Sequence, residues 1–294
     1  MKDEFDIDLP LVRALVSEQF PEFAGLPIQP VRSTGTDNAM FRLGRNACAR
    51  LPLRRSSFAA IEKEAIVLPR VESLPIRTPR LLGRGAASKS FPGPWLMLSW
   101  IDGDTLSTPA FGSTPTIVSE LAVFLRSLHA CPIDGVPLPG AHNHHRGCPL
   151  IDRDEPTRAA IHALQSLYPS ADLLAIWERS LGEGGAADAN VLVHGDLHIG
   201  NMLLSGEPTL SGIIDFGLSA AGDPAVDYMV AWSFLDTPAR RQFRNRIETS
   251  EACWIRAKGW ALSVAAIALE FYTSDRHFLH KLSRRTLDTV LEKE

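Results

Sequence analysis

The chain has 294 residues, of which 45% are hydrophobic and 22% charged, as expected of a packed globular protein. This length allows one large domain or two lobes around a cleft. A formal net charge of −4 argues against a nucleic-acid-binding surface but would not repel a small cationic molecule.

The first third of the chain alternates between helical and strand-like patterns. Apolar residues at helical spacing predict a helix that Pro21 ends, and alternating residues on both sides of the turn at 44–46 predict a β-hairpin. The expected helices cover 9–20 and 57–68, and the expected strands lie near Val31 and at 40–43, 47–51, 78–83 and 95–100.

Beyond residue 100 the pattern is mainly helical. A polar segment at 101–104 looks like a hinge, and the Pro/Gly-rich stretch at 132–149 holds His142, His144 and His145. Because no cysteine or carboxylate cluster accompanies these histidines, we expect a solvated loop and not a metal site. The expected helices cover 115–130, 157–167, 171–181, 224–235, 237–247, 251–271 and 275–291.

The most informative stretch lies near residue 200. Val191–Val193 reads as a buried strand that leads into Asp196, and a hairpin then brings Asn201 close to Asp215. Phosphoryl transfer needs one carboxylate to orient the attacking hydroxyl, and an amide oxygen and a second carboxylate to hold magnesium. The alternative is a plain hairpin with turn-forming Asp and Asn. The complete ordered set favours a small-molecule kinase.

These residues resemble the aminoglycoside phosphotransferase family of antibiotic and small-metabolite kinases. His194–Asn201 matches the family's HGDxxxxN motif, Ile214–Gly217 its IDFG-like motif, and Gly222–Asp227 its GDPxxD segment. The resemblance implies an α+β, bilobal protein-kinase-like fold. It has a small antiparallel-sheet N-terminal lobe, expected at 1–100, and a larger, mainly helical C-terminal lobe, expected at 101–294.

The resemblance also implies roles for single residues. Asp196 would be the catalytic base, Asn201 and Asp215 would bind Mg²⁺, and Asp227 would brace the catalytic loop. The implied nucleotide-binding residues are Ser33, Thr34 and Gly35 in a phosphate-covering turn, Arg50 with Glu64 as its partner, and Leu98, Ser99 and Trp100 at the adenine edge.

Several of these assignments have structural alternatives. The Ser33–Gly35 turn could be an ordinary hairpin loop, and Trp100 could be a core residue. Arg50 stands where kinases carry a lysine, so it could bind phosphate through its planar fork or form a surface ion pair.

The resemblance implies transfer of the γ-phosphoryl group of ATP (or GTP) to a hydroxyl of an aminoglycoside- or macrolide-like antibiotic. Two alternatives stay open. One is a housekeeping kinase of a sugar, choline-like or amino alcohol, and the other is an inactive nucleotide-binding protein. The sequence does not distinguish ATP from GTP or reveal the oligomeric state.

The remaining features predict where the protein works. Four widely spaced cysteines read as free thiols in a reducing cytoplasm. The acidic N-terminus lacks the apolar core of a signal peptide, and the longest apolar run, 260–269, is too short to span a bilayer. We therefore expect a cytoplasmic enzyme with no membrane partner.

Overall fold

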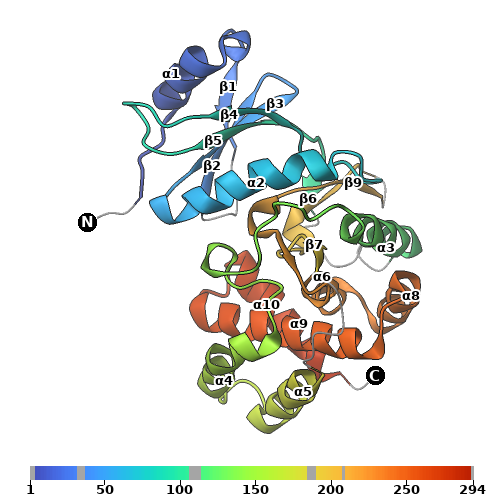
Figure 1. Cartoon of the computed structure of the whole chain (residues 1–294). Helices are drawn as coiled ribbons and strands as arrows, with labels where there is room; N and C mark the ends of the chain where they lie inside the picture. Colours follow the sequence, from blue (N-terminus) through green and yellow to red (C-terminus); the bar gives the residue numbers. More distant parts are fainter. Residues whose placement is uncertain (1–3, 32–36, 106–113, 184–189, 207–208, 293–294) are drawn as a thin grey trace.

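The computed structural model describes residues 4–31, 37–105, 114–183, 190–206 and 209–292. Figure 1 shows a sheet-containing part above a larger helical part. The sheet has five antiparallel strands in the order β1-β2-β3-β5-β4. Their bounds are β1 Ile28–Pro30, β2 Asn38–Leu43, β3 Ala47–Pro52, β4 Leu81–Gly85 and β5 Trp95–Ser99.

Helices cover both faces of this sheet. Val12, Leu15 and Val16 of α1 (Leu9–Gln19) pack with Trp95 and Met97 of β5 in one core cluster. On the opposite face, α2 (Phe58–Val71) joins a second core cluster, which continues into the helical part. Alternate residues of a strand point to opposite faces, and helices cover both faces of this sheet, so β3 is buried along its whole length. Arg50 lies in this central strand.

Short sheets and helices make up the rest of the chain. β6 (Asp104–Thr105), β8 (Met202–Leu204) and β9 (Leu210–Ile213) form a three-stranded sheet, and β7 (Val191–Val193) pairs with β10 (Ala220–Gly222). The helices are α3 Pro115–His129, α4 Asp154–Ala163, α5 Ser170–Gly182, α6 Ala225–Tyr228, α7 Val230–Phe234, α8 Thr237–Ile247, α9 Glu251–Phe271 and α10 Phe278–Leu291.

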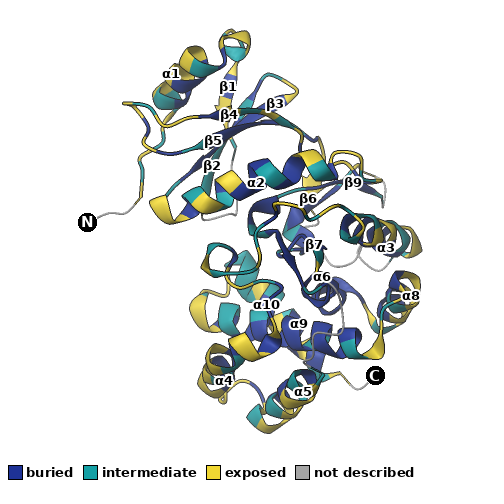
Figure 2. Cartoon of the chain, viewed as in Figure 1, coloured by how far each residue is buried: buried dark blue, intermediate teal, exposed yellow. Residues whose placement is uncertain are grey.

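Helix α9 is the central helix of this second part. It is the one helix in the described ranges that is long and apolar enough to cross a membrane by composition, but 67% of its apolar window is buried inside the protein. Its inward face contacts α4, α5, α6 and α10. This face is buried and is drawn dark blue in Figure 2. Packing therefore accounts for its apolar composition.

The predicted elements occur near their expected positions, with shifted ends. β4 begins at Leu81 and not at Thr78, because Pro79 has no N–H to contribute to a strand ladder. The expected helix at 224–235 is divided into α6 and α7 at Met229. The core cluster that includes α2 runs without interruption into the later helices, so a lobe division at residue 100 remains a prediction.

Candidate functional site

The loop after β7 is held by one buried carboxylate. Asp227 in α6 is fully buried and accepts hydrogen bonds from the backbone N–H groups of His194 and Gly195, each at 2.9 Å. His129 Nε2 lies 3.0 Å from the same carboxylate. The predicted brace by Asp227 is therefore confirmed, and the loop leaves β7 in a fixed direction.

His194 links this loop to the segment that carries Asp215. Its Nδ1 accepts from the backbone N–H of Asp196 at 3.3 Å, so its proton lies on Nε2, which donates to the carbonyl of Ile214 at 3.1 Å. Burial lowers the pKa of this histidine, which keeps the ring neutral. The neutral ring fixes the spacing between the two carboxylate-bearing segments.

Asp196 stands between two cationic or donating side chains. Its Oδ1 lies 3.7 Å from Arg146 Nη2 and its Oδ2 lies 3.7 Å from His198 Nε2, while 27% of its side chain is exposed. Burial alone would raise the pKa of this carboxyl, but His198 and Arg146 lower it well below its usual range. The carboxylate is thus ionised at neutral pH and can accept a hydrogen bond from an incoming hydroxyl.

The two predicted metal ligands sit at one end of the β8–β9 hairpin. The Asn201 amide nitrogen donates to the backbone carbonyl of Asp196 at 2.9 Å, which leaves its Oδ1 as the atom available to a cation. Asp215 has a left-handed backbone with φ of 69°, and 39% of its side chain is exposed. An amide oxygen and a carboxylate are hard ligands, and Mg²⁺ commonly takes only one or two from the protein. These residues fit a magnesium ion.

Arg50 in β3 connects the sheet to α2 through Glu64 and to the segment after β9 through Asp215. Its Nη1 donates to Glu64 Oε1 at 3.3 Å and its Nη2 to Asp215 Oδ1 at 2.6 Å. Its Nε lies 3.2 Å from Glu64 Oε2 without hydrogen-bond alignment. The structure thus pairs Arg50 with the expected glutamate in α2, and not with a surface carboxylate.

The trio of Arg50, Glu64 and Asp215 contains one guanidinium and two carboxyl groups, and their pKa values are shifted by burial and by one another. Burial would lower the pKa of Arg50, but the two carboxylates outweigh it and raise that pKa. Burial raises the pKa of Glu64 to about 7, and the charge of Asp215 adds to the effect. One cation therefore serves two carboxylates.

Ser33, Thr34 and Gly35 lie outside the described residues, so their phosphate-binding role stays a prediction. Leu98 is buried in β5, where it pairs with Cys48 and Leu81 on the two neighbouring strands. Its backbone is therefore part of the sheet interior.

The backbone N–H groups beside Leu98 already have partners. Ser99 donates to the carbonyl of Arg80 at 2.9 Å, and Trp100 donates to the carbonyl of Asn46 at 2.8 Å. The edge of an adenine bound at Ser99 and Trp100 would therefore have to contact their backbone carbonyl oxygens and not their N–H groups.

The Trp100 side chain belongs to a surface cluster. Its ring lies under the Arg42 guanidinium at 4.6 Å, and its Nε1 donates to Asp102 at 2.8 Å. Arg42 also pairs with Asp102 at 2.9 Å. The ring is half-buried and only borders the core.

Sequence reasoning missed two side chains near this site. Arg146 comes from the loop that was expected to be solvated, and no local pattern marks it. Lys63 of α2 is only 2% exposed, and its Nζ lies 3.1 Å from His142 Nδ1. Its position next to Glu64 on the helix was a signal that could have found it.

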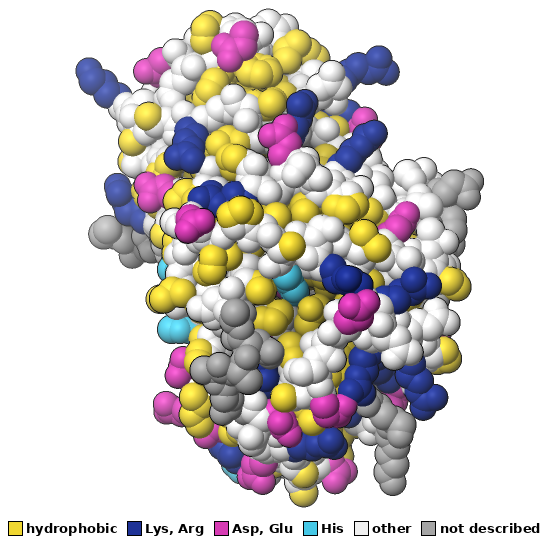
Figure 3. Space-filling model, turned by 45° about the vertical axis from the view of Figure 1, so that its right-hand side comes forward, with side chains coloured by type: hydrophobic (Ala, Val, Ile, Leu, Met, Phe, Trp, Pro, Cys, Tyr) yellow, Lys and Arg dark blue, Asp and Glu magenta, His cyan; other side chains and the backbone are white. Residues whose placement is uncertain are grey.

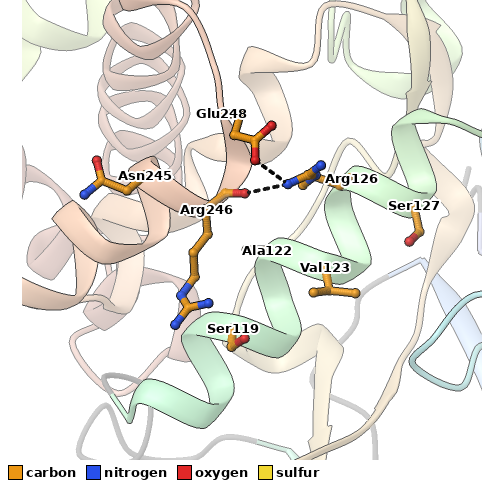
Figure 4. Close-up of a pocket in the computed structure, with 8 residues that line it drawn as sticks. All are labelled: Ser119, Ala122, Val123, Arg126, Ser127, Asn245, Arg246 and Glu248. Atoms are coloured by element: carbon orange, nitrogen blue, oxygen red, sulfur yellow. Dashed lines mark hydrogen bonds and ion pairs between the residues drawn. The ribbon is translucent and has the colours of Figure 1, made fainter.

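Two cavities lie away from these residues. One of about 840 Å³ borders the loop after β4. Another of about 510 Å³ lies between α3 and α8, where Arg126 bonds to Glu248 at 2.8 Å and to the carbonyl of Arg246 (Figure 4). It is lined by Ser119, Ala122, Val123, Arg126, Ser127, Asn245, Arg246 and Glu248, none of them a predicted site residue.

Surface charge around the molecule is mixed. On the face in Figure 3, Lys and Arg side chains lie among Asp and Glu side chains, with several basic groups gathered at the lower right. That face does not present one continuous basic surface of the kind that tracks a nucleic-acid backbone.

Comparison with known proteins places the chain among phosphotransferases. Residues 28–260 match the sequence model of the phosphotransferase enzyme family. An aminoglycoside 3'-phosphotransferase of Escherichia coli is 27% identical over 145 residues, which cover 48% of this chain and 53% of that protein. Viomycin phosphotransferase of Streptomyces vinaceus is 30% identical over 165 residues, which cover 52% of this chain and 55% of that protein. The chain spans about half the length of these curated relatives.

Solved structures extend the likeness to the whole fold. The GDP and kanamycin complex of APH(2")-IIia superposes with a TM-score of 0.69 and 18% identity, over 95% of this chain and 97% of that chain. The predicted bilobal, kinase-like α+β fold is confirmed.

Proposed function

The chain belongs to the phosphotransferase enzyme family, and we propose that it is a small-molecule kinase that transfers the γ-phosphoryl group of ATP or GTP to a hydroxyl of its acceptor. The observation that carries this proposal is the shared anchoring of Asp196 and Asn201. The Asn201 amide donates to the backbone carbonyl of Asp196, and the Asp227 carboxylate accepts from two backbone N–H groups of the same loop.

In this proposal the residues divide the work of an in-line transfer. Asp196 orients the acceptor hydroxyl and takes its proton. A bond forms between the acceptor oxygen and the γ-phosphorus, while the bond from that phosphorus to the β–γ bridging oxygen breaks. Phosphoryl transfer demands little covalent chemistry from the protein, so positioning of the hydroxyl contributes more than the basicity of Asp196.

Asn201 and Asp215 would hold Mg²⁺, which when bound neutralises charge on the phosphate oxygens. Arg50 would contribute a fixed cation beside them, since Glu64 keeps its guanidinium in place. Ser33, Thr34 and Gly35 would cover the phosphates, and Leu98, Ser99 and Trp100 would border the base through their carbonyl groups.

We infer the acceptor class from the relatives. Their names specify aminoglycosides and viomycin, and a related structure holds GDP and kanamycin. Another structurally similar protein is named macrolide 2'-phosphotransferase type I. An aminoglycoside- or macrolide-like antibiotic is therefore our first candidate. All four cysteines are free thiols, which supports a location in the reducing cytoplasm.

Asp196→Asn tests the proposal. We expect turnover to fall by roughly 10²-fold or more, because the amide cannot accept the hydroxyl proton. Mg-nucleotide affinity, measured by calorimetry, should change little. Asp172→Asn, an exposed change in α5, is the control and should leave turnover intact. Kanamycin, viomycin, a macrolide, a sugar and choline form the acceptor panel. Near-normal turnover of Asp196→Asn would remove Asp196 from the mechanism.

A further inference from the structure

Arg146 is a nearly buried guanidinium beside the proposed base. Only 13% of its side chain is exposed, and its Nη2 lies 3.7 Å from Asp196 Oδ1. Its Nη1 reaches only the sulfur of Met229, at 3.7 Å, and its Nε has no hydrogen-bond partner among the described residues. Buried guanidinium groups normally form short, often bidentate hydrogen bonds to carboxylates. Arg146 therefore retains donors that no residue in the described ranges accepts from.

The backbone that carries Arg146 is unusual. His144, His145 and Gly147 all have left-handed backbones, with φ of 52°, 56° and 85°. Such a conformation costs about 1 kcal/mol or more for each residue other than glycine and persists where the surroundings enforce it. Strain of this kind at consecutive positions often marks a functional site.

Asn143 enforces this loop conformation. It is fully buried, and its Oδ1 accepts from the N–H of Gly140 at 2.9 Å. Its amide nitrogen donates to the carbonyl of Arg146 at 2.9 Å and to that of Leu218 at 3.2 Å. One side chain thus ties the Arg146 loop to the segment that follows Asp215.

The catalytic loop also fits closely against the Arg146 loop. A Cβ at Gly195 would lie 3.4 Å from the Cβ of Arg146 and 2.3 Å from the carbonyl of Leu218. The N–H of Asp223 donates to the carbonyl of Gly147 at 2.8 Å. The position of Arg146 against Asp196 is thus fixed from both sides of the site.

We propose that Arg146 is a further catalytic residue, which donates hydrogen bonds to oxygens of the transferred phosphoryl group while Asp196 holds the acceptor hydroxyl. The proposal rests on the function proposed above. The acceptor oxygen must meet Asp196, so the phosphoryl group passes close to the unused donors of Arg146. The 3.7 Å gap is too wide for a direct hydrogen bond and leaves both groups free to bind substrate.

Arg146 complements Arg50 on the other side of the reaction. Arg50 is bound to Glu64 and Asp215 and so belongs to the metal side. Arg146 would meet the charge that spreads over the equatorial oxygens in the transition state. It keeps its own protons, since the only proton transferred is that of the acceptor hydroxyl, which goes to Asp196.

The test uses the full chain with Mg-ADP, alone and with aluminium fluoride, which mimics the transferred phosphoryl group and needs no known acceptor. The variants are Arg146→Ala and Arg146→Lys, with Arg158→Ala, a surface ion-pair change, as the control. We expect Arg146→Ala to bind Mg-ADP within about threefold of the wild type. It should lose roughly 10²-fold or more of the extra affinity that fluoride gives. In a separate turnover assay with an acceptor from the panel above, kcat should fall by a similar factor with little change in KM. Added guanidinium ion should restore part of the loss.

The same measurement in the Asp196→Asn background separates contact with phosphate from an effect through Asp196. Arg146→Ala should still remove the fluoride-dependent affinity there, and no further loss would overturn the inference. Wild-type fluoride enhancement and kcat in Arg146→Ala would overturn it while the proposed function stands. Arg146→Lys, which preserves the charge, covers the case in which the alanine variant fails to fold. A wild-type chain that binds no Mg-nucleotide would refute the proposed function and this inference with it.

Discussion

The support that Asp227 gives to the loop carrying Asp196 yields a prediction that does not depend on the acceptor. Asp227→Asn preserves the shape of the side chain but replaces one carboxylate oxygen with an NH₂ group. In the native protein both oxygens face donors, namely the N–H groups of His194 and Gly195 and the Nε2 of His129. Whichever way the amide turns, its NH₂ meets a donor and leaves it without an acceptor.

The magnitude follows from these contacts. A buried donor left without a partner costs about 1–3 kcal/mol, and a hydrogen bond to a neutral group is about 1 kcal/mol weaker than one to a charged group. Asp227 is fully buried, so water cannot replace the lost acceptor. Together these two terms predict that the free energy of unfolding falls by roughly 3 kcal/mol.

Urea unfolding followed by tryptophan fluorescence measures this loss, and turnover is compared under conditions in which both proteins are folded. Turnover should fall by about tenfold or more, because the N–H groups of His194 and Gly195 position Asp196 and lose part of their support in the variant. Asp154→Asn is a matched control, since Asp154 is hydrogen-bonded to Trp177 and lies outside the site. It should lose stability without losing turnover. A stability within about 0.5 kcal/mol of the wild type and unchanged turnover for Asp227→Asn would refute the bracing role.

Two further predictions concern Arg50 of β3 and Lys63 of α2. Arg50→Lys should weaken Mg-nucleotide binding by roughly tenfold in calorimetry, because one ammonium cannot replace the fork that spans Glu64 and Asp215; unchanged affinity would mean that the fork is dispensable. Lys63→Met should stabilise the protein below pH 8, because burial lowers the pKa of Lys63 from its ordinary 10.5 to about 8. This shift corresponds to a cost of roughly 3 kcal/mol for burying the charged amine, from which the lost hydrogen bond has to be subtracted. The unfolded chain binds the additional proton between these values, so wild-type stability rises as pH goes from 8 to 10.5 and the advantage of the variant shrinks. An equal advantage in urea unfolding at pH 7 and pH 10 would contradict the burial argument.

Much of the site could be predicted because its parts are local in sequence. Asn201 and Asp215 are joined by one short hairpin, and Asp196 lies five residues before Asn201, so strand periodicity and turn residues suffice to bring them near one another. The Arg50–Glu64 pair followed from a strand and the next helix. Its geometry is as expected.

The contribution of Arg146 could not be predicted in this way. It reaches Asp196 across 50 residues of chain, and it does so through consecutive left-handed residues. Histidine is enriched among residues with positive φ, but most histidines still have a negative φ, so the sequence His144-His145 does not by itself predict this conformation. The enforcing contacts come from Asn143 and the segment near Leu218. They exist only once the later part of the chain has folded.

The two arginines of the site differ in a way that bears on their tasks. Arg50 has short contacts to two carboxylates, which outweigh burial and raise its pKa. Arg146 has one carboxylate at 3.7 Å, and burial lowers its pKa. A guanidinium that is already well bound gains little from a further anion, whereas one that is buried and poorly bound gains much. The protein thus holds Arg50 in fixed contacts with two carboxylates and leaves Arg146 to be completed by substrate, as transition-state binding requires.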